Sequence, residues 1–254
     1  MNPVPSAWEV YLQQFFFGIY PYLCMAVFLI GSLARFDRDQ YTWKSDSSQL
    51  LRHRSLRLGS NLFHAGVLFL LLGHAVGMLT PHAVYAPLIT AAQKQMLAIV
   101  AGGVAGGIAL VGLSILLWRR WSDPRIRLTS RTGDLAILAI LWIQLVLGLA
   151  TLPPSLQHAD GAVMMALADW AQRIVTFRPL AEDLSWLAWP YKLHMVLGMT
   201  IFLVFPFTRL VHVWSGLAAV AYLFRPWQLV RSRRLQLHPD TNVRSARLVV
   251  AAAA

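Results

Sequence analysis

The chain has 254 residues, of which 57% are hydrophobic and only 13% are charged. Soluble domains are about 45–50% apolar and about 25% charged, so this composition indicates an integral membrane protein. The net charge of +11 does not by itself predict a nucleic-acid partner, because the distribution of basic residues matters more than their total in a membrane protein. The single cysteine, Cys24, excludes a disulfide framework, an iron–sulfur cluster held by this chain alone and a covalent C-x-x-C-H attachment motif.

Five apolar runs are long enough to cross a bilayer, since about 20 residues at about 1.5 Å each span the hydrocarbon core. They are Phe15–Leu33, Leu58–Leu79, Met96–Trp118, Leu135–Thr151 and Leu193–Val213. The first run has no lysine or arginine before it and a basic loop after it, so we interpret it as a retained helix rather than a signal peptide. The sequence therefore predicts an all-α integral membrane protein with five transmembrane helices. Residues 1–231 form its membrane domain, and residues 232–254 a disordered cytoplasmic tail.

Basic residues set the expected orientation. Most of the 22 lysines and arginines lie in the loop after the first run, the loop after the third run and the C-terminal tail. The N-terminal flank has none, and the loop after the fourth run mixes basic with acidic residues. By the positive-inside rule the N-terminus is periplasmic and the C-terminus cytoplasmic, in a multi-pass protein of the bacterial inner membrane.

Three local patterns carry further expectations. The glycines Gly102, Gly103, Gly106 and Gly107 make two interleaved G-x-x-x-G pairs, which favour close approach of a neighbouring helix or of a flat cofactor. Pro206 predicts a kink within the fifth run. The stretch Asp160–Ile174 has helical spacing and is expected along the membrane surface.

Two of the runs each carry two histidines, which are costly inside a membrane and usually functional. The second run holds His64 and His74, and the fifth holds His194 and His212. Because these helices run in opposite directions, we expect His64 to face His212 toward the cytoplasm and His74 to face His194 toward the periplasm. The spacing along the two helices agrees less well. His64 and His74 are ten residues apart, a helical rise of about 15 Å, whereas His194 and His212 are eighteen residues apart, a rise of about 27 Å. Tilt and the Pro206 kink must absorb the difference.

Two imidazoles at each level suit an octahedral iron whose other four positions a porphyrin supplies, whereas zinc requires about four ligands in a tetrahedron. The sequence thus predicts two non-covalent, b-type haems held between helices two and five. Arg209, three residues before His212, is a candidate partner for a haem propionate. The alternative is that the histidines only form hydrogen bonds between helices.

Lys94 opens the third run beside the periplasmic end of the second, in an otherwise uncharged loop. Two interpretations remain open from its position. The ammonium group extends to lipid head groups, or it donates a hydrogen bond to a quinol near the haem held by His74. Gly73 leaves room for quinol access beside His74.

Several longer stretches share a pattern with one family. They are QYTW at 40–43, SNLFH at 60–64, GH at 73–74, GMLTPH at 77–82, KQM at 94–96, QHADG at 157–161, WAQ at 170–172, VLGMT at 196–200 and FPFTRLVH at 205–212. In these residues the chain resembles the gamma subunit of respiratory membrane-bound nitrate reductase, the cytochrome b that anchors that complex. It departs from the pattern at its N-terminus, in Arg178–Trp189 and beyond about Leu235.

The resemblance implies two b haems, one ligated by His64 and His212 and the other by His74 and His194, with a quinol contact at Lys94. It also implies an iron–sulfur subunit that docks at the cytoplasmic face and passes electrons to a molybdenum catalytic subunit. We therefore expect a di-haem subunit that oxidises quinol and carries electrons inward. The basic loop Arg35–Arg57 and the tail from Arg225 are expected to bind the partner, or else to lie against anionic lipid.

Two other functions remain as alternatives to this interpretation. In the first, the chain is a cytochrome b of another quinone-linked reductase. In the second, it is a cofactor-free anchor or transporter whose histidines relay protons.

Overall fold

The computed structural model describes residues 6–38, 53–178 and 184–214. The chain divides into a unit Met1–Val213 and a second unit Trp214–Ala254, and the helices below belong to the first. The predicted tail 232–254, the boundary at 231 and most of the predicted docking loop and tail lie outside the described residues.

Throughout its described ranges the chain is helical, and five helices are long and apolar enough to span a membrane. The first span joins α1 (Ala7–Gln14), a π-helical turn (Phe15–Ile19) and α2 (Tyr20–Arg38). The others are α3 (His53–Leu79), α5 (Ala91–Ser122), α7 (Thr132–Ala150) continued by α8 (Leu152–Gln157), and α10 (Trp189–Val204). Three shorter helices connect them: α4 (His82–Tyr85), α6 (Pro124–Thr129) and α9 (Ala162–Val175). The five predicted spans are confirmed.

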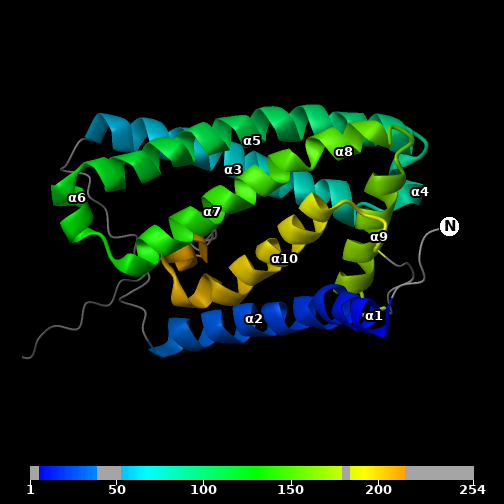
Figure 1. The fold of residues 1–254 in the computed structure, drawn as a ribbon, viewed down its shortest axis with the longest axis horizontal. Helices are drawn as coiled ribbons and strands as arrows, with labels where there is room; N and C mark the ends of the chain where they lie inside the picture. Colours follow the sequence, from blue (N-terminus) through cyan, green and yellow to red (C-terminus); the bar gives the residue numbers. More distant parts are fainter. Residues whose placement is uncertain (1–5, 39–52, 179–183, 215–254) are drawn as a thin grey trace, which may run out of the picture. The chain divides into compact units, whose positions relative to one another are not determined.

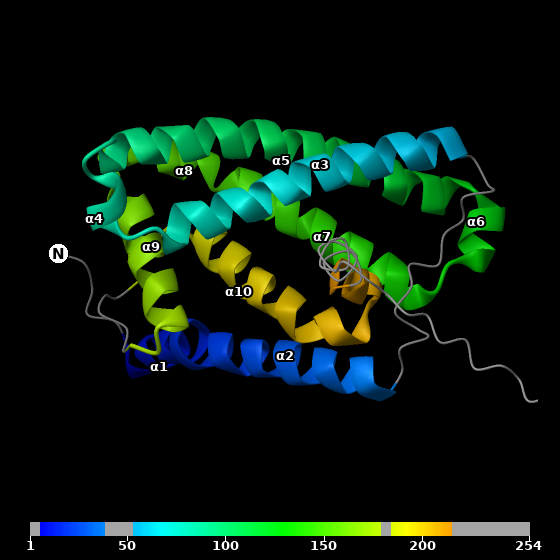
Figure 2. The same cartoon turned by 180° about the vertical axis from the view of Figure 1, so that it is seen from behind.

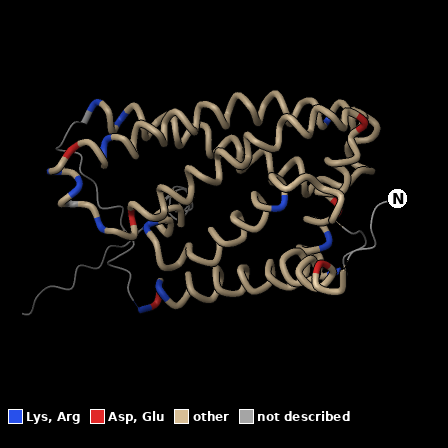
Figure 3. Tube along the Cα trace, in the orientation of Figure 1, with Lys and Arg blue, Asp and Glu red and all other residues tan. Residues whose placement is uncertain are grey.

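The spans pack in a fixed order. α3 lies along α5, α5 also packs on α7, and α10 lies between α7 and α2 (Figures 1 and 2). Lysine and arginine are concentrated at the end of this unit where α6 lies (Figure 3). That segregation agrees with the charge pattern from which the orientation was predicted.

Small residues bring α3 and α5 into close contact. A Cβ added to Gly66 would lie 2.6 Å from the carbonyl oxygen of Ala105, and one added to Gly112 would collide with the backbone nitrogen of Phe63. With lipid outside, such close van der Waals packing is a main source of helix association. It fixes α3, and with it both of the α3 histidines, against a long neighbour.

The expected G-x-x-x-G contact is only partly correct. Gly106 meets the side chain of Leu149, whose Cδ2 would lie 2.9 Å from an added Cβ, but nothing lies within 4 Å of such an atom at Gly102 or Gly107. The closest helix contact uses glycines outside the predicted stripe, because the face that α5 turns to α3 is displaced from that stripe.

The stretch predicted along the membrane surface is indeed helical, as α9, but its apolar face packs against protein. Val163, Trp170 and Ile174 belong to a buried cluster with Phe17 from the first span. The indole Nε1 of Trp170 donates to the carbonyl oxygen of Phe17 at 2.9 Å, within the π-helical turn. This amphipathic face therefore covers the end of the bundle, and the placement of α9 along the membrane surface stays a prediction.

The fifth run is not one kinked helix. α10 ends at Val204 and is followed by a 3₁₀ turn Phe205–Phe207, an extended Thr208 and a second 3₁₀ turn Arg209–Val211. Pro206 has no N–H to donate and its ring crowds the preceding turn, so the α-helix stops instead of bending. The predicted rise of about 27 Å between His194 and His212 therefore does not apply, since it assumed continuous helix.

Candidate metal centres

The four histidines predicted as metal ligands form two pairs. The ring centres of His64 and His212 are 6.2 Å apart, and those of His74 and His194 are also 6.2 Å apart. The ring planes are inclined at 74° in the first pair and 35° in the second. The structure thus brings together the same pairs that the opposite directions of the two helices predicted.

All four imidazoles are oriented by the same kind of hydrogen bond, from ring Nδ1 to a backbone carbonyl oxygen. His64 donates to Ser60 at 2.8 Å, His74 to Leu70 at 2.7 Å, His194 to Gln144 at 3.1 Å and His212 to Arg209 at 2.7 Å. Because a carbonyl only accepts, Nδ1 carries a proton, and in a neutral imidazole Nε2 then has the lone pair. Metal-binding histidines are oriented in this way by a carbonyl or carboxylate partner.

The distance within each pair would suit two imidazoles that bind one metal ion between them. Two metal–nitrogen bonds of about 2 Å, plus about 1.1 Å from each nitrogen to its ring centre, separate the centres by roughly 6 Å. No group of three or more His, Cys, Asp or Glu able to hold a metal ion occurs in the described part of the chain. Two imidazoles per level therefore suit a metal whose other positions come from a porphyrin, rather than a tetrahedral ion.

Exposed leucines of α3 lie between the two pairs. Leu68 and Leu71 follow His64 by one and two turns, and Leu71 also lies one turn before His74. Their side chains are 61% and 55% exposed in the chain taken alone. An apolar face of this kind can cover a porphyrin, so the residues present fit a b-type haem at each level.

His194 is seated on α7, a contact that sequence analysis missed. A Cβ added to Gly148 would lie 2.9 Å from His194 Cε1, so only glycine leaves room for the ring in this position. One turn earlier, the backbone carbonyl of Gln144 accepts a hydrogen bond from the His194 ring, and the Gln144 side-chain Nε2 donates to the His194 carbonyl at 3.0 Å. The sequence offered little signal, because a glycine in a leucine-rich run is ordinary in membrane helices.

Arg209 lies near the His64–His212 pair but has an acidic neighbour. Its Nη1 is 3.8 Å from Oδ2 of Asp134 on α7, and both side chains are largely buried. The structure therefore pairs Arg209 with a carboxylate that sequence analysis did not associate with it. Its role toward a propionate stays a prediction.

Lys94 is buried, with 7% of its surface exposed, and its Nζ lies 3.7 Å from the centre of the Tyr85 ring. Within the described ranges this ammonium nitrogen has no hydrogen-bond partner. A lysine that extends to lipid head groups would expose its nitrogen, so the burial argues against that interpretation. A cation over an aromatic face is stabilised, but a buried ammonium also requires an acceptor.

Two further observations concern Tyr85 and Gly73. The Tyr85 hydroxyl donates to Met165 Sδ at 3.1 Å, and burial raises the pKa of Tyr85, so this hydroxyl stays protonated. On α3, nothing lies within 4 Å of a Cβ added to Gly73. The role of Gly73 in quinol access stays a prediction.

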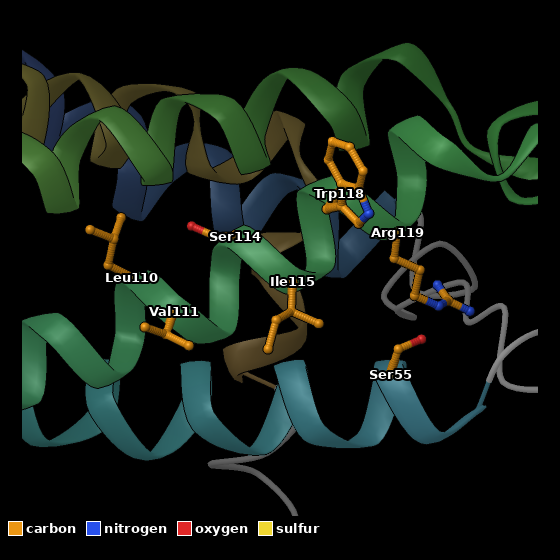
Figure 4. A pocket seen from close by; sticks show the side chains of 7 residues that line it. All are labelled: Ser55, Leu110, Val111, Ser114, Ile115, Trp118 and Arg119. Atoms are coloured by element: carbon orange, nitrogen blue, oxygen red, sulfur yellow. The ribbon is translucent and has the colours of Figure 1, made fainter.

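A separate hollow of about 430 Å³ lies between α3 and α5 near α6 (Figure 4). Its lining residues are Ser55, Leu110, Val111, Ser114, Ile115, Trp118 and Arg119. None of the four histidines borders it, so it does not belong to the candidate metal centres.

The described helices and the paired imidazoles define a class: an all-helical, multi-pass membrane protein with two facing histidine pairs. The family profile described as nitrate reductase gamma subunit matches residues 13–233. The chain is 53% identical to the respiratory nitrate reductase 2 gamma chain and 50% identical to the respiratory nitrate reductase 1 gamma chain of Escherichia coli (strain K12). Each alignment covers 88% of this chain and 99% of the relative.

A third relative, the nitrate reductase gamma chain of Bacillus subtilis (strain 168), is 38% identical over 87% of this chain and 98% of its own length. The chain belongs to the nitrate reductase gamma subunit family and is a membrane subunit of a nitrate reductase complex. The resemblance stated from the sequence motifs is confirmed.

Proposed function

We propose that this chain is the di-haem b, quinol-oxidising subunit of its nitrate reductase. Quinol is oxidised near the periplasmic end, and electrons pass inward to an iron–sulfur subunit and from there to a molybdenum catalytic subunit at the cytoplasmic face. The single observation that carries this proposal is the pair of 6.2 Å separations between imidazole rings, each ring held through Nδ1 with Nε2 left available. Haem, when bound, supplies reversible one-electron transfer.

The residues of the chain would position and bury the haems and would donate a hydrogen bond to the quinol. His64 and His212 would hold the cytoplasmic-side haem, and His74 and His194 the periplasmic-side haem. Lys94, buried against Tyr85, would donate to a quinol oxygen, and Gly73 would leave quinol access to the periplasmic-side haem. Arg209 would neutralise a propionate of the cytoplasmic-side haem while Asp134 limits its motion.

The test is a reduced-minus-oxidised visible spectrum of the purified complex, with a chemical count of haem per gamma chain. We expect two b haems, both reduced by a soluble quinol analogue. A chain without haem would overturn the proposal in favour of a cofactor-free anchor, in which the histidines only relay protons or join helices.

Substitution of each histidine by alanine tests the pairing. Redox titration should show that His64→Ala and His212→Ala remove one haem, and that His74→Ala and His194→Ala remove the other. Loss patterns that group His64 with His74 would contradict ligation across α3 and the fifth span.

A further inference from the structure

Arg35, near the end of α2, turns to the break in the fifth span. Its Nη1 donates to the carbonyl oxygen of Pro206 at 2.6 Å and to that of Thr208 at 2.9 Å. The Pro206 carbonyl lies where α10 has stopped, and the Thr208 carbonyl begins the second 3₁₀ turn, so Arg35 binds on both sides of this break. A carbonyl shielded from water requires a hydrogen-bond donor, and Arg35 supplies one from a neighbouring helix.

Gly31 lies one turn before Arg35 on the same face of α2. A Cβ added to Gly31 would lie 2.9 Å from Cγ of Pro206, whose side chain is fully buried. The missing side chain at 31 admits the proline ring, and the guanidinium at 35 binds the carbonyls beyond it. We name these two residues the α2 clamp.

The clamped segment leads directly to His212. The Thr208 hydroxyl accepts from the backbone nitrogen of Leu210 at 3.3 Å and so begins the second 3₁₀ turn. The His212 ring then donates to the carbonyl oxygen of Arg209, the residue after Thr208. The path from Arg35 to the imidazole thus consists of short, hydrogen-bonded steps, and a shift of Thr208 would move His212 relative to His64.

We propose that Arg35 is a positioning residue for the cytoplasmic-side haem, acting through the break at Pro206 and Thr208 to set the place of His212. This inference rests on the proposed function, since it requires that His64 and His212 ligate a haem. It assigns to α2, a helix without a predicted ligand, the placement of His212. It also means that Arg35, which the charge pattern had placed in a partner-docking loop, binds the carbonyls of Pro206 and Thr208 within the protein.

The experiment compares Arg35→Met and Arg35→Lys with Arg38→Met in the purified complex. Arg38 is an exposed arginine at the end of α2 and is the matched control. The readout is the rate at which each haem is lost to an excess of a haem-scavenging apoprotein, together with the electron paramagnetic resonance signal of each oxidised haem. Turnover is not used, because Arg38 lies where a partner subunit is predicted to dock.

We expect Arg35→Met to release the haem held by His64 and His212 about 10- to 100-fold faster, the range typical for loss of a residue that supports a metal ligand. Its resonance signal should change, while the haem held by His74 and His194 keeps its wild-type rate and signal. Arg35→Lys should recover part of the effect, since one ammonium can still donate to both carbonyls. Arg38→Met should match wild type.

The outcomes separate the two proposals. If wild type holds two haems and Arg35→Met loses both equally, or neither faster, Arg35 is not a positioning residue and the proposed function stands. If wild type holds no haem, the proposed function and this inference both fail. If Arg35→Met does not assemble, Gly31→Ala, which displaces Pro206 and keeps the guanidinium, should give the same selective loss, and equal loss of both haems would overturn the inference.

Discussion

The imidazole of His194 lies against Gly148 of α7, where a Cβ on residue 148 would be 2.9 Å from the ring carbon Cε1. The contact makes α7 the wall behind one predicted haem ligand, although α7 supplies no ligand of its own. Gln144 adds two hydrogen bonds to the same residue, one to the ring and one from its amide to the backbone.

Gly148→Ala should therefore displace the His194 ring and selectively weaken the periplasmic-side haem. Loss of ligand support typically costs about 10- to 100-fold in affinity, measured here as haem retention in purified protein. Gly133→Ala, on the same helix with nothing within 4 Å of an added Cβ, is the control and should retain both haems. Equal retention in the two variants would show that the His194 ring accommodates the methyl group.

Lys94→Ala should slow quinol-driven reduction of the haems and leave haem content unchanged. Loss of one charge-assisted hydrogen bond costs about 1.5–3 kcal/mol, or about 10- to 100-fold in binding or rate. The measurement is the rate of haem reduction by a soluble quinol analogue after rapid mixing. An artificial donor that reduces the cytoplasmic partner directly should support normal nitrate reduction. Wild-type rates with quinol would leave Lys94 without a substrate role.

Tyr85→Leu should reproduce part of the Lys94 effect, whereas Tyr85→Phe should not. The Tyr85 ring lies 3.7 Å from Lys94 Nζ, and an exposed to partly buried cation–π contact contributes about 0.5–2 kcal/mol. Phenylalanine keeps the aromatic face and loses only the hydroxyl bond to Met165. The same quinol reduction assay checks both variants, and equal rates for leucine and phenylalanine would exclude positioning by the ring.

Gly66→Val should separate α3 from α5 and destabilise the whole bundle. An added Cβ at Gly66 would lie 2.6 Å from the Ala105 carbonyl, and overpacking of this kind costs about 1–3 kcal/mol. Because α3 carries His64 and His74, both haems should be lost together on heating. The melting temperature followed by haem absorbance measures the effect, with Gly107→Val in open space as the control. A melt that matches the control would contradict close α3–α5 packing.

Deletion of residues 231–254 tests the predicted docking surface. If the basic tail binds the iron–sulfur partner, the soluble subunits should leave the membrane in moderate salt, since exposed charge contacts are screened. Both haems should remain, because the histidine pairs lie outside the deleted segment. If the complex stays on the membrane, the tail is dispensable and the loop before α3 remains the candidate.

Much of the architecture could be predicted from the sequence. Long uncharged runs determine five spans because a backbone in lipid must satisfy its own hydrogen bonds, and helices do so within one segment. The order of those spans makes helices two and five antiparallel, which alone predicts that His64 faces His212 and His74 faces His194. The motifs around these residues were specific enough to indicate the family that the comparisons confirm.

The tertiary structure decided what depends on neighbours distant in sequence. Pro206 predicted a disturbance of the fifth run, but the sequence did not show that Gly31 would contact the proline ring and that Arg35 would bind the carbonyls of Pro206 and Thr208. The burial of Lys94 depends on Tyr85 and on the placement of α4. The position of the His194 ring depends on Gly148 of α7. Composition determines which segments enter the membrane, because the free energy of transfer from water to lipid is a sum over individual residues. The position of each imidazole depends on the shape of the adjacent helix, because close packing is a property of pairs of surfaces.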